Sequence, residues 1–196
     1  MDIYDLIGAI LSLLCTYLFV KAVKRAWLLS ALAIPFDSYV YYRSSLFGDM
    51  FLQCFYMAST YYGWSQWRSG GVKQGDLEIS YSSIYSLLFI GCIAIIGIVI
   101  INPLLKPFNH ANIALLDAIT TVLSLCAQWL LCRKKIESWF LWFIVDAFYI
   151  YLYDIKTLPF HSVMALVYLI MAITGFYNWR KEYIKNTFTN EDVLHI

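Results

Sequence analysis

The sequence predicts an all-α membrane protein with seven transmembrane helices, arranged as three helices, a connector and three more. Three observations lead to this fold class: the composition, the spacing of the apolar segments and an internal repeat. Of the 196 residues, 61% are hydrophobic and only 14% are charged, whereas soluble domains average roughly 45–50% and about 25%. This composition is typical of an integral membrane protein.

Seven apolar segments approach the length that crosses a bilayer, which is about 20 mostly apolar residues. Lipid offers no hydrogen-bond partners to the backbone, and a helix satisfies its own backbone groups, so we expect each segment to be a helix. The second and sixth are short and need their aromatic ends to reach the membrane interfaces. The expected spans are Ile3–Val20, Trp27–Tyr42, Leu46–Trp67, Ile84–Ile101, Ala111–Cys132, Trp139–Tyr153 and Leu158–Trp179.

The basic residues divide unevenly between the two sides that these spans define. Arg43, Lys106 and Lys156 fall on one side, and the other eleven of the 14 Lys and Arg residues fall on the opposite side. Cytoplasmic loops carry the excess of basic residues, so we expect an outside N-terminus and a cytoplasmic C-terminus. The net charge of +1 gives no indication of a nucleic-acid partner.

The first and last parts of the chain match without a gap at an offset of 112 positions, which aligns Trp27 with Trp139, Gly63 with Gly175 and the Trp-Arg pair at 67–68 with that at 179–180. The first three spans are then equivalent to the last three. The fourth is a peripheral connector that leaves both units the same way up, as in parallel-repeat transporters. We expect one transmembrane domain over residues 1–196, with repeats at 1–70 and 108–182, a loop and connector at 71–107 and a cytoplasmic tail at 183–196.

A carboxylate lies in the middle of the sixth apolar segment, where one charge costs about 2.5–3.5 kcal/mol on insertion scales. Trp139, Trp142, Asp146 and Tyr149 recur at helical spacing and share one face. We expect this face to line a cavity between the units, where aromatic rings and a carboxylate favour a flat cationic ligand. The stripe expected to face it comes from the third span and contains Gln53, Tyr56, Thr60 and Trp64.

Simpler interpretations remain for several of these residues. Four tryptophans near one membrane face could form an interfacial aromatic belt; they are Trp64, Trp67, Trp139 and Trp179. Gln53 and Thr60 could join helices by hydrogen bonds, and Asp146 could bond to a neighbouring helix. Asp37 follows Pro35 and could serve only a kink, and the role of Asp117 stays open.

No motif for a phosphate-binding loop, a zinc protease or a serine hydrolase occurs, and no Cys/His metal cluster. We therefore expect no enzyme activity, cofactor or metal. Two alternatives stay open: a membrane enzyme acting on a lipid-like substrate, and a passive channel. The enzyme would need paired carboxylates near the cytoplasmic face, and Glu137 alone is acidic in the two basic loops after the first and fifth spans.

The block YYGWSQWRSGG at 61–71, the WFLW pattern from Trp139 and the three-plus-one-plus-three repeat resemble the PnuC family of bacterial vitamin transporters over essentially the whole chain. The resemblance implies a fold like that of SWEET sugar transporters, often as a homotrimer, in the bacterial inner membrane. It implies import of a small cationic vitamin, nicotinamide riboside or a thiamine-type relative, by facilitated diffusion. A cytosolic kinase would then trap the vitamin by phosphorylation.

The sixth-span pattern of that family is Trp-x-x-Trp-x-x-x-Asn, and here Asp146 stands in place of the Asn. Riboside carriers tend to have Asn near the two glycines where this chain has Thr60 and Thr174, which favours thiamine. The vitamin, any ion coupling and the oligomeric state stay open. The candidate substrate-binding residues are Trp142, Asp146, Tyr149, Gln53, Tyr56, Thr60, Trp64, Trp139, Thr174 and Asn178.

Overall fold

The protein is a helical bundle in a computed structural model that describes residues 3–43, 47–69, 77–107, 111–155 and 159–194. The described residues form seven helices, as expected. The largest difference from the expected spans is in the last helix, which continues well past Trp179. The helices are α1 (Ile3–Val20), α2 (Ala26–Arg43), α3 (Phe47–Ser69), α4 (Ile84–Leu105), α5 (Ala111–Cys132), α6 (Glu137–Ile155) and α7 (Pro159–Leu194).

Four of the described helices are long and apolar enough to cross a membrane, judged by length and composition: α4, α5, α6 and α7. In α1 the apolar run is shorter, from Leu6 to Val20. Polar residues such as Asp37 in α2 and Gln53 in α3 make these two helices less apolar. The chain is therefore a multi-helix membrane protein.

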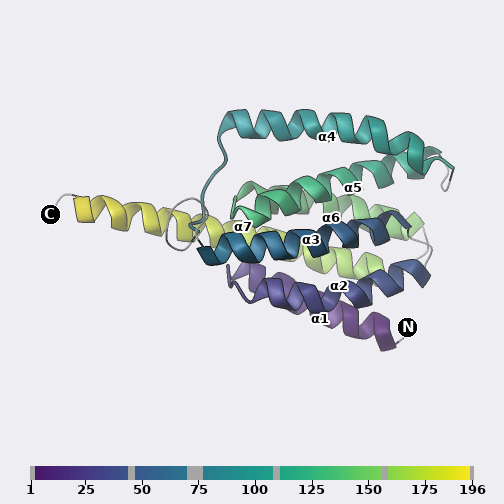
Figure 1. The fold of residues 1–196 in the computed structure, drawn as a ribbon, viewed down its shortest axis with the longest axis horizontal. Coiled ribbons are helices and arrows are strands. Elements are labelled where there is room, and N and C mark those ends of the chain that lie inside the picture. Colours follow the sequence, from purple (N-terminus) through teal and green to yellow (C-terminus); the bar gives the residue numbers. More distant parts are fainter. Residues whose placement is uncertain (1–2, 44–46, 70–76, 108–110, 156–158, 195–196) are drawn as a thin grey trace.

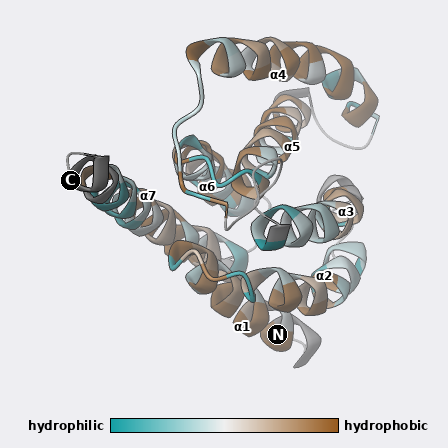
Figure 2. Cartoon of the chain, turned by 60° about the vertical axis from the view of Figure 1, so that its left-hand side comes forward, coloured by the Kyte–Doolittle hydropathy of each residue, from teal (hydrophilic) through white to brown (hydrophobic). Residues whose placement is uncertain are grey.

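Helices α1–α3 and α5–α7, called here the first and the second unit, are separated in sequence by α4 (Figure 1). Within each unit, successive helices pack side by side: α1 on α2 and α2 on α3, then α5 on α6 and α6 on α7. The units meet where α1 packs on α7 and α3 on α5. Helix α4 packs on α5 at the edge of the bundle, as expected, and its surface is largely hydrophobic (Figure 2).

The turns after α1 and after α5 have the same backbone construction. Ala22 and Lys134 have left-handed φ angles of 53° and 51°, which are uncommon for residues other than glycine. In each turn the next amide reaches back five residues, from Val23 to Leu18 O at 2.9 Å and from Lys135 to Leu130 O at 3.0 Å. Such left-handed caps satisfy the last carbonyls of a helix.

The turn after α5 is also held by the segment that precedes α4. Ser80 pairs with Lys135 as an isolated bridge, and the Lys135 Nζ donates to Ser80 Oγ at 2.8 Å. The Glu137 carboxylate accepts from the Ser82 amide at 2.9 Å. Burial lowers the pKa of Lys135 below its usual 10.5, opposed by nearby Glu137 and reinforced by Arg133. These contacts of Lys135 and Glu137 with Ser80 and Ser82 therefore fasten the segment before α4 to the second unit.

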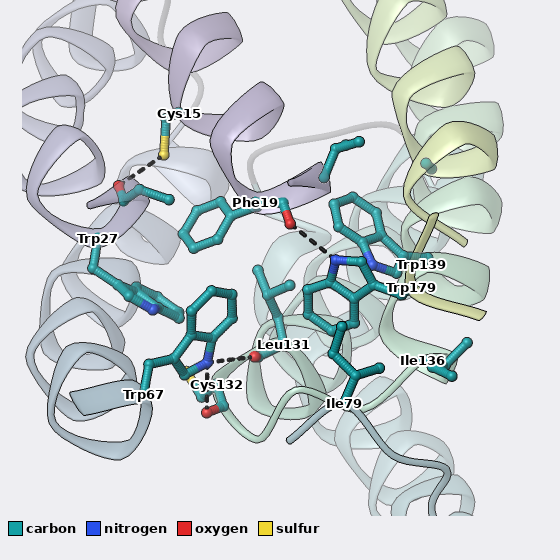
Figure 3. Packing of buried hydrophobic residues seen from close by; sticks show 13 residues of the cluster. Cys15, Phe19, Trp27, Trp67, Ile79, Leu131, Cys132, Ile136, Trp139 and Trp179 are labelled. Atoms are coloured by element: carbon teal, nitrogen blue, oxygen red, sulfur yellow. Dashed lines mark hydrogen bonds between the residues drawn. The ribbon is translucent and has the colours of Figure 1, made fainter. Parts of the chain in front are cut away.

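One end of the bundle, called here the tryptophan end, holds a cluster of buried rings (Figure 3). Trp27 packs edge-on against Trp67 at 5.5 Å, and Trp139 against Trp179 at 5.4 Å. Trp67 Nε1 donates to the carbonyls of Leu131 and Cys132 at 3.2 and 3.1 Å. Trp179 Nε1 donates to Phe19 O at 3.0 Å.

The interpretation of these tryptophans as an interfacial belt is wrong for Trp67, Trp139 and Trp179, whose side chains are between 0 and 2% exposed. Their rings pack on one another and on other helices instead of facing the membrane interface. Trp64 is partly buried and packs against the same cluster. These rings therefore join the two units.

Two glycines let the tryptophan rings approach a helix backbone. A Cβ at Gly63 would lie 2.3 Å from the Trp27 ring, and one at Gly175 would lie 2.5 Å from the Trp139 ring. Real Cβ atoms essentially never come that close. Glycine is required at both positions because any side chain would displace a buried ring.

Candidate functional site

A cavity of about 250 Å³ lies inside the bundle, lined by residues of α1, α2, α3, α5, α6 and α7. Helix α4 contributes no described residue to its wall. Ligand pockets for small molecules are commonly about 300–1,000 Å³ and mostly apolar, with a few polar groups that orient the ligand. The size therefore fits a compact solute.

The wall from α6 is aromatic and contains one carboxylate. Asp146 is 7% exposed and lies one turn from Trp142 and close to one turn from Tyr149. All three line the cavity. No described residue donates a hydrogen bond to the Asp146 carboxylate. The interpretation of Asp146 as a structural bond between helices therefore has no support in the described residues.

Further rings extend this wall. Tyr149 and Tyr153 stack in parallel, with centroids 5.1 Å apart and planes 10° apart. Tyr56, from α3, approaches the Trp142 ring at 6.4 Å. Ring faces attract cations, by about 0.5–1 kcal/mol at exposed sites and 2 or more when desolvated. The α6 wall can therefore hold a positively charged ring.

The wall from α1 and α2 is hydroxyl-rich and holds a second carboxylate. The Ser12 hydroxyl donates to Asp37 Oδ2 at 2.7 Å, and Thr16 donates to Ser12 O at 2.9 Å. Ser30 also lines the cavity. None of the described lining residues is Lys or Arg. Among the described lining residues, the cavity thus carries two carboxylates and His161 but neither Lys nor Arg.

Comparison with known proteins assigns the family. The model of the nicotinamide mononucleotide transporter family matches residues 2–181. The chain belongs to this family. The family inferred from the sequence motifs is thereby confirmed, and the chain is a membrane transporter by family.

Curated members of this family are similar over most of the chain. The nicotinamide riboside transporter PnuC of Escherichia coli strain K12 is 22% identical, over 90% of this chain and 86% of that protein. PnuC of Neisseria mucosa is 24% identical, over 89% and 71%. A crystal structure of the vitamin B3 transporter PnuC has a TM-score of 0.76 at 23% identity, covering 91% of this chain and 80% of that one. The fold is therefore that of this family.

Of the ten candidate residues, six lie on the cavity wall: Gln53, Tyr56, Trp139, Trp142, Asp146 and Tyr149. Their role in binding remains a prediction. Gln53 is 6% exposed. Trp139 lies between the cavity and the tryptophan end.

The other four candidates lie elsewhere among the described residues. Thr60 donates to Tyr56 O at 2.8 Å and pairs with Ser30 Oγ at 3.2 Å. Thr174 is exposed and donates to Ile170 O; it follows the cavity residue Ala172 by two positions, which is about 200° round a helix. Trp64 packs on the tryptophan cluster, and Asn178 is half-buried beside Trp179 in α7.

Several residues that line the cavity are not among the candidates predicted from the sequence. Tyr168 lines the cavity from α7 and is the partner of Tyr56 at the 112-residue offset, so the repeat could have identified it. His161 lies against the rings of Tyr41 and Tyr153 at 6.4 and 5.4 Å. No sequence signal distinguished His161: beside Phe160 of its own helix, its ring neighbours Tyr41 and Tyr153 come from α2 and α6.

Proposed function

We propose that this protein imports a small cationic vitamin of the nicotinamide riboside or thiamine type by facilitated diffusion across a bacterial inner membrane. The observation that carries the proposal is the Asp146 carboxylate, 7% exposed, on an aromatic cavity wall. An ionised carboxylate is unfavourable when it is buried without a compensating charge or hydrogen bond. A bound cation would compensate that cost, and Trp142 and Tyr149 would add cation–π attraction.

The charge of the cavity supports an unphosphorylated substrate. A phosphate monoester carries about −1.5 to −2 charges at neutral pH, and it would face Asp37 and Asp146 with no Lys or Arg among the described lining residues. Like charges brought together in a site cost several kcal/mol. The family model is named for the mononucleotide and the curated relatives for the riboside, and this cavity favours the riboside form. Phosphorylation by a cytosolic kinase would then prevent return through the same cavity.

The choice between the two vitamins rests on fewer residues than the sequence implied. Thr174 is exposed and is not among the described lining residues, and Thr60 is bonded to Tyr56 and Ser30. Their lack of amide groups therefore gives little reason to prefer thiamine. The names of the curated relatives favour nicotinamide riboside. Both vitamins carry a cationic ring, as the α6 wall requires, so they are to be compared directly.

The proposal includes two SWEET-like parallel repeats. Two reciprocal hydrogen bonds support it: Trp67 donates to Leu131 O, and Trp179 donates to Phe19 O. Trp179 and Leu131 stand 112 positions after Trp67 and Phe19, so each unit makes the same bond to the other. The matching turns at Ala22 and Lys134 support it as well.

The orientation and assembly are part of the same proposal. The eleven basic residues on one side favour a cytoplasmic tryptophan end and C-terminus, with the N-terminus outside. The family resemblance implies a homotrimer. In α4, whose sole buried residue is Ala94, large apolar side chains are left for lipid or for other copies of the chain.

Binding by the purified protein tests the function. Nicotinamide riboside, thiamine and their monophosphates are titrated calorimetrically into protein in lipid nanodiscs. We expect one or both vitamins to bind and the monophosphates to bind at least tenfold more weakly. Asp146→Asn should weaken vitamin binding about tenfold or more, because hydrogen bonds to charged groups contribute about 1.5–3 kcal/mol.

The control is Asp154→Asn, an exposed carboxylate near the end of the same helix, which should leave binding unchanged. Saturable uptake of unmodified vitamin into proteoliposomes should accompany binding. Absence of binding by both vitamins would refute the proposal. Single-channel currents would support a channel instead, and turnover of a lipid-like substrate would support an enzyme.

A further inference from the structure

The carboxylate of Asp37 is held in a defined orientation against α1. Its Oδ2 accepts the Ser12 hydroxyl at 2.7 Å. Its Oδ1 lies where Gly8 has no side chain, because a Cβ there would be 2.7 Å away. Gly8 and Ser12 are one helical turn apart, so one face of α1 receives the carboxylate. Asp37 and Ser12 both line the cavity.

The two carboxylates of the cavity have different surroundings. Asp146 lies among Trp142 and Tyr149 on an aromatic wall, whereas Asp37 accepts the Ser12 hydroxyl on the wall from α1 and α2. Tyr168 lies near both carboxylates. Rings suit a cation, and hydroxyls with a carboxylate suit hydrogen bonding. The cavity therefore has a cation pole at Asp146 and a hydrogen-bonding pole at Asp37.

The charge of the solute bears on the role of Asp37. A vitamin with one positive charge compensates only one of the two carboxylates. A carboxylate offers about four acceptor sites, and the Ser12 hydroxyl is one of the groups that interact with Asp37. Donor groups on the solute, such as amino hydrogens or a pair of hydroxyls, can add hydrogen bonds to this carboxylate and compensate for the water removed from Asp37.

We propose that Asp37, oriented by Ser12, is a specificity-determining residue that binds the hydrogen-bond-donating end of the solute while Asp146 binds its cationic ring. This rests on the proposed function of the cavity. The substrate class is then narrower: a cationic ring joined to a second group that donates hydrogen bonds. The ribose diol of nicotinamide riboside and the aminopyrimidine of thiamine are both such groups.

The interpretation of Asp37 as a residue that serves only the Pro35 kink makes a different prediction. A change in helix shape alters the whole cavity and weakens every ligand alike. Loss of a specific anchor weakens only ligands that have the second group. Comparing complete with truncated ligands therefore separates the two roles.

The experiment titrates four probes into the full chain in nanodiscs. Two are nicotinamide riboside and thiamine. The others keep the cationic ring and lack the donor group: 1-methylnicotinamide, and a thiazolium with a benzyl group in place of the aminopyrimidine. The variants are Asp37→Asn, Ser12→Ala and Asp146→Asn, with Asp154→Asn as the control, each checked for monodisperse elution.

We expect Asp37→Asn to lower the affinity for whichever vitamin binds by about tenfold, which corresponds to the loss of one charge-assisted hydrogen bond. The affinity for the truncated form of the same vitamin should change by no more than about twofold. Ser12→Ala should weaken the same vitamin less, with the same selectivity, since it acts only by positioning Asp37. Asp146→Asn should weaken both probes. If Asp37→Asn fails to fold, the selectivity of Ser12→Ala decides.

Equal weakening of vitamin and truncated ring by the Asp37 or Ser12 variants would overturn the anchor, and so would no weakening of either. In those cases vitamin binding by the unaltered protein leaves the proposed function intact. If the unaltered protein binds neither vitamins nor rings, the proposed function fails and the anchor fails with it.

Discussion

The two three-helix units are alike at the tryptophan end and different along the cavity. Both have the same left-handed turn, the same tryptophan-on-glycine contact and the same indole bond to the other unit. At mid-cavity the equivalent positions diverge. At the 112-residue offset Asp146 corresponds to Ile34, Asp37 to Tyr149 and Trp142 to Ser30.

This difference separates the residues that join the two units from the residues that line the cavity. Residues that join the units must satisfy both sides of a contact, so they stay matched. In the proposed function, the cavity residues contact a solute that lacks this symmetry, so one wall can be aromatic while the other is polar. Fold and site chemistry are thus set by different positions of the same helices.

The largest expected effect comes from substituting a residue that is the same in both units. Gly63→Ala and Gly175→Ala should each sharply reduce the yield of folded protein, because the new Cβ would lie 2.3 or 2.5 Å from a buried indole. Overpacking typically costs about 1–3 kcal/mol, occasionally more. The fraction of monodisperse protein after detergent extraction measures it.

Gly91→Ala is the matched control, since a Cβ there meets nothing within 4 Å. It should extract like the unaltered protein. Equal yields for all three variants would mean that the tryptophan–glycine contacts do not constrain the fold.

The next largest effect should come from a position at which the two units differ, when its residue is changed to resemble its counterpart. Asp146→Leu gives α6 the apolar character that Ile34 has in α2. Vitamin affinity should fall about tenfold or more, since the cation loses its carboxylate. The melting temperature should hold or rise, because the change removes a buried carboxylate that receives no hydrogen bond from the described residues. A fall in both affinity and melting temperature would instead assign Asp146 a structural role.

A smaller effect tests the reciprocal indole bonds. Trp67→Phe and Trp179→Phe remove donors to buried carbonyls, each at a cost of about 1–3 kcal/mol. Trp67→Phe should destabilise more, because Trp67 donates to two carbonyls and Trp179 to one. Thermal unfolding in nanodiscs measures both, with the 40%-exposed Trp129→Phe as the control. The reverse order would contradict the bonding.

The smallest effect concerns the contacts of Lys135 and Glu137 with the segment before α4. Lys135 loses its proton at a lower pH when folded, because burial lowers its pKa. Between that lowered pKa and 10.5 the unfolded chain binds more protons, so stability should rise slightly with pH across this window and not below it. Lys135→Met should flatten the rise, whereas the exposed Lys181→Met should not. An identical alkaline slope in both variants would exclude Lys135 as its source.

Helical periodicity predicts the α6 part of the candidate site. The spacing of Asp146, Trp142 and Tyr149 along a single helix suffices to put them on one face. Asp37 could not be interpreted in the same way, because its orientation depends on Ser12 and Gly8 of another helix. The role of Thr174 stays a prediction: it is two positions from the cavity residue Ala172, about 200° round the helix, and is not among the described lining residues.

Helix α7 is the longest element, 36 residues that continue past the bundle without interruption (Figure 1). At 1.5 Å per residue it is about 54 Å long. Because Trp179 anchors it within the buried cluster, the protruding part should follow every rotation of the second unit. A rigid marker protein joined in helical register after Thr187 would enlarge the particle for electron microscopy and report the angle of that unit during transport.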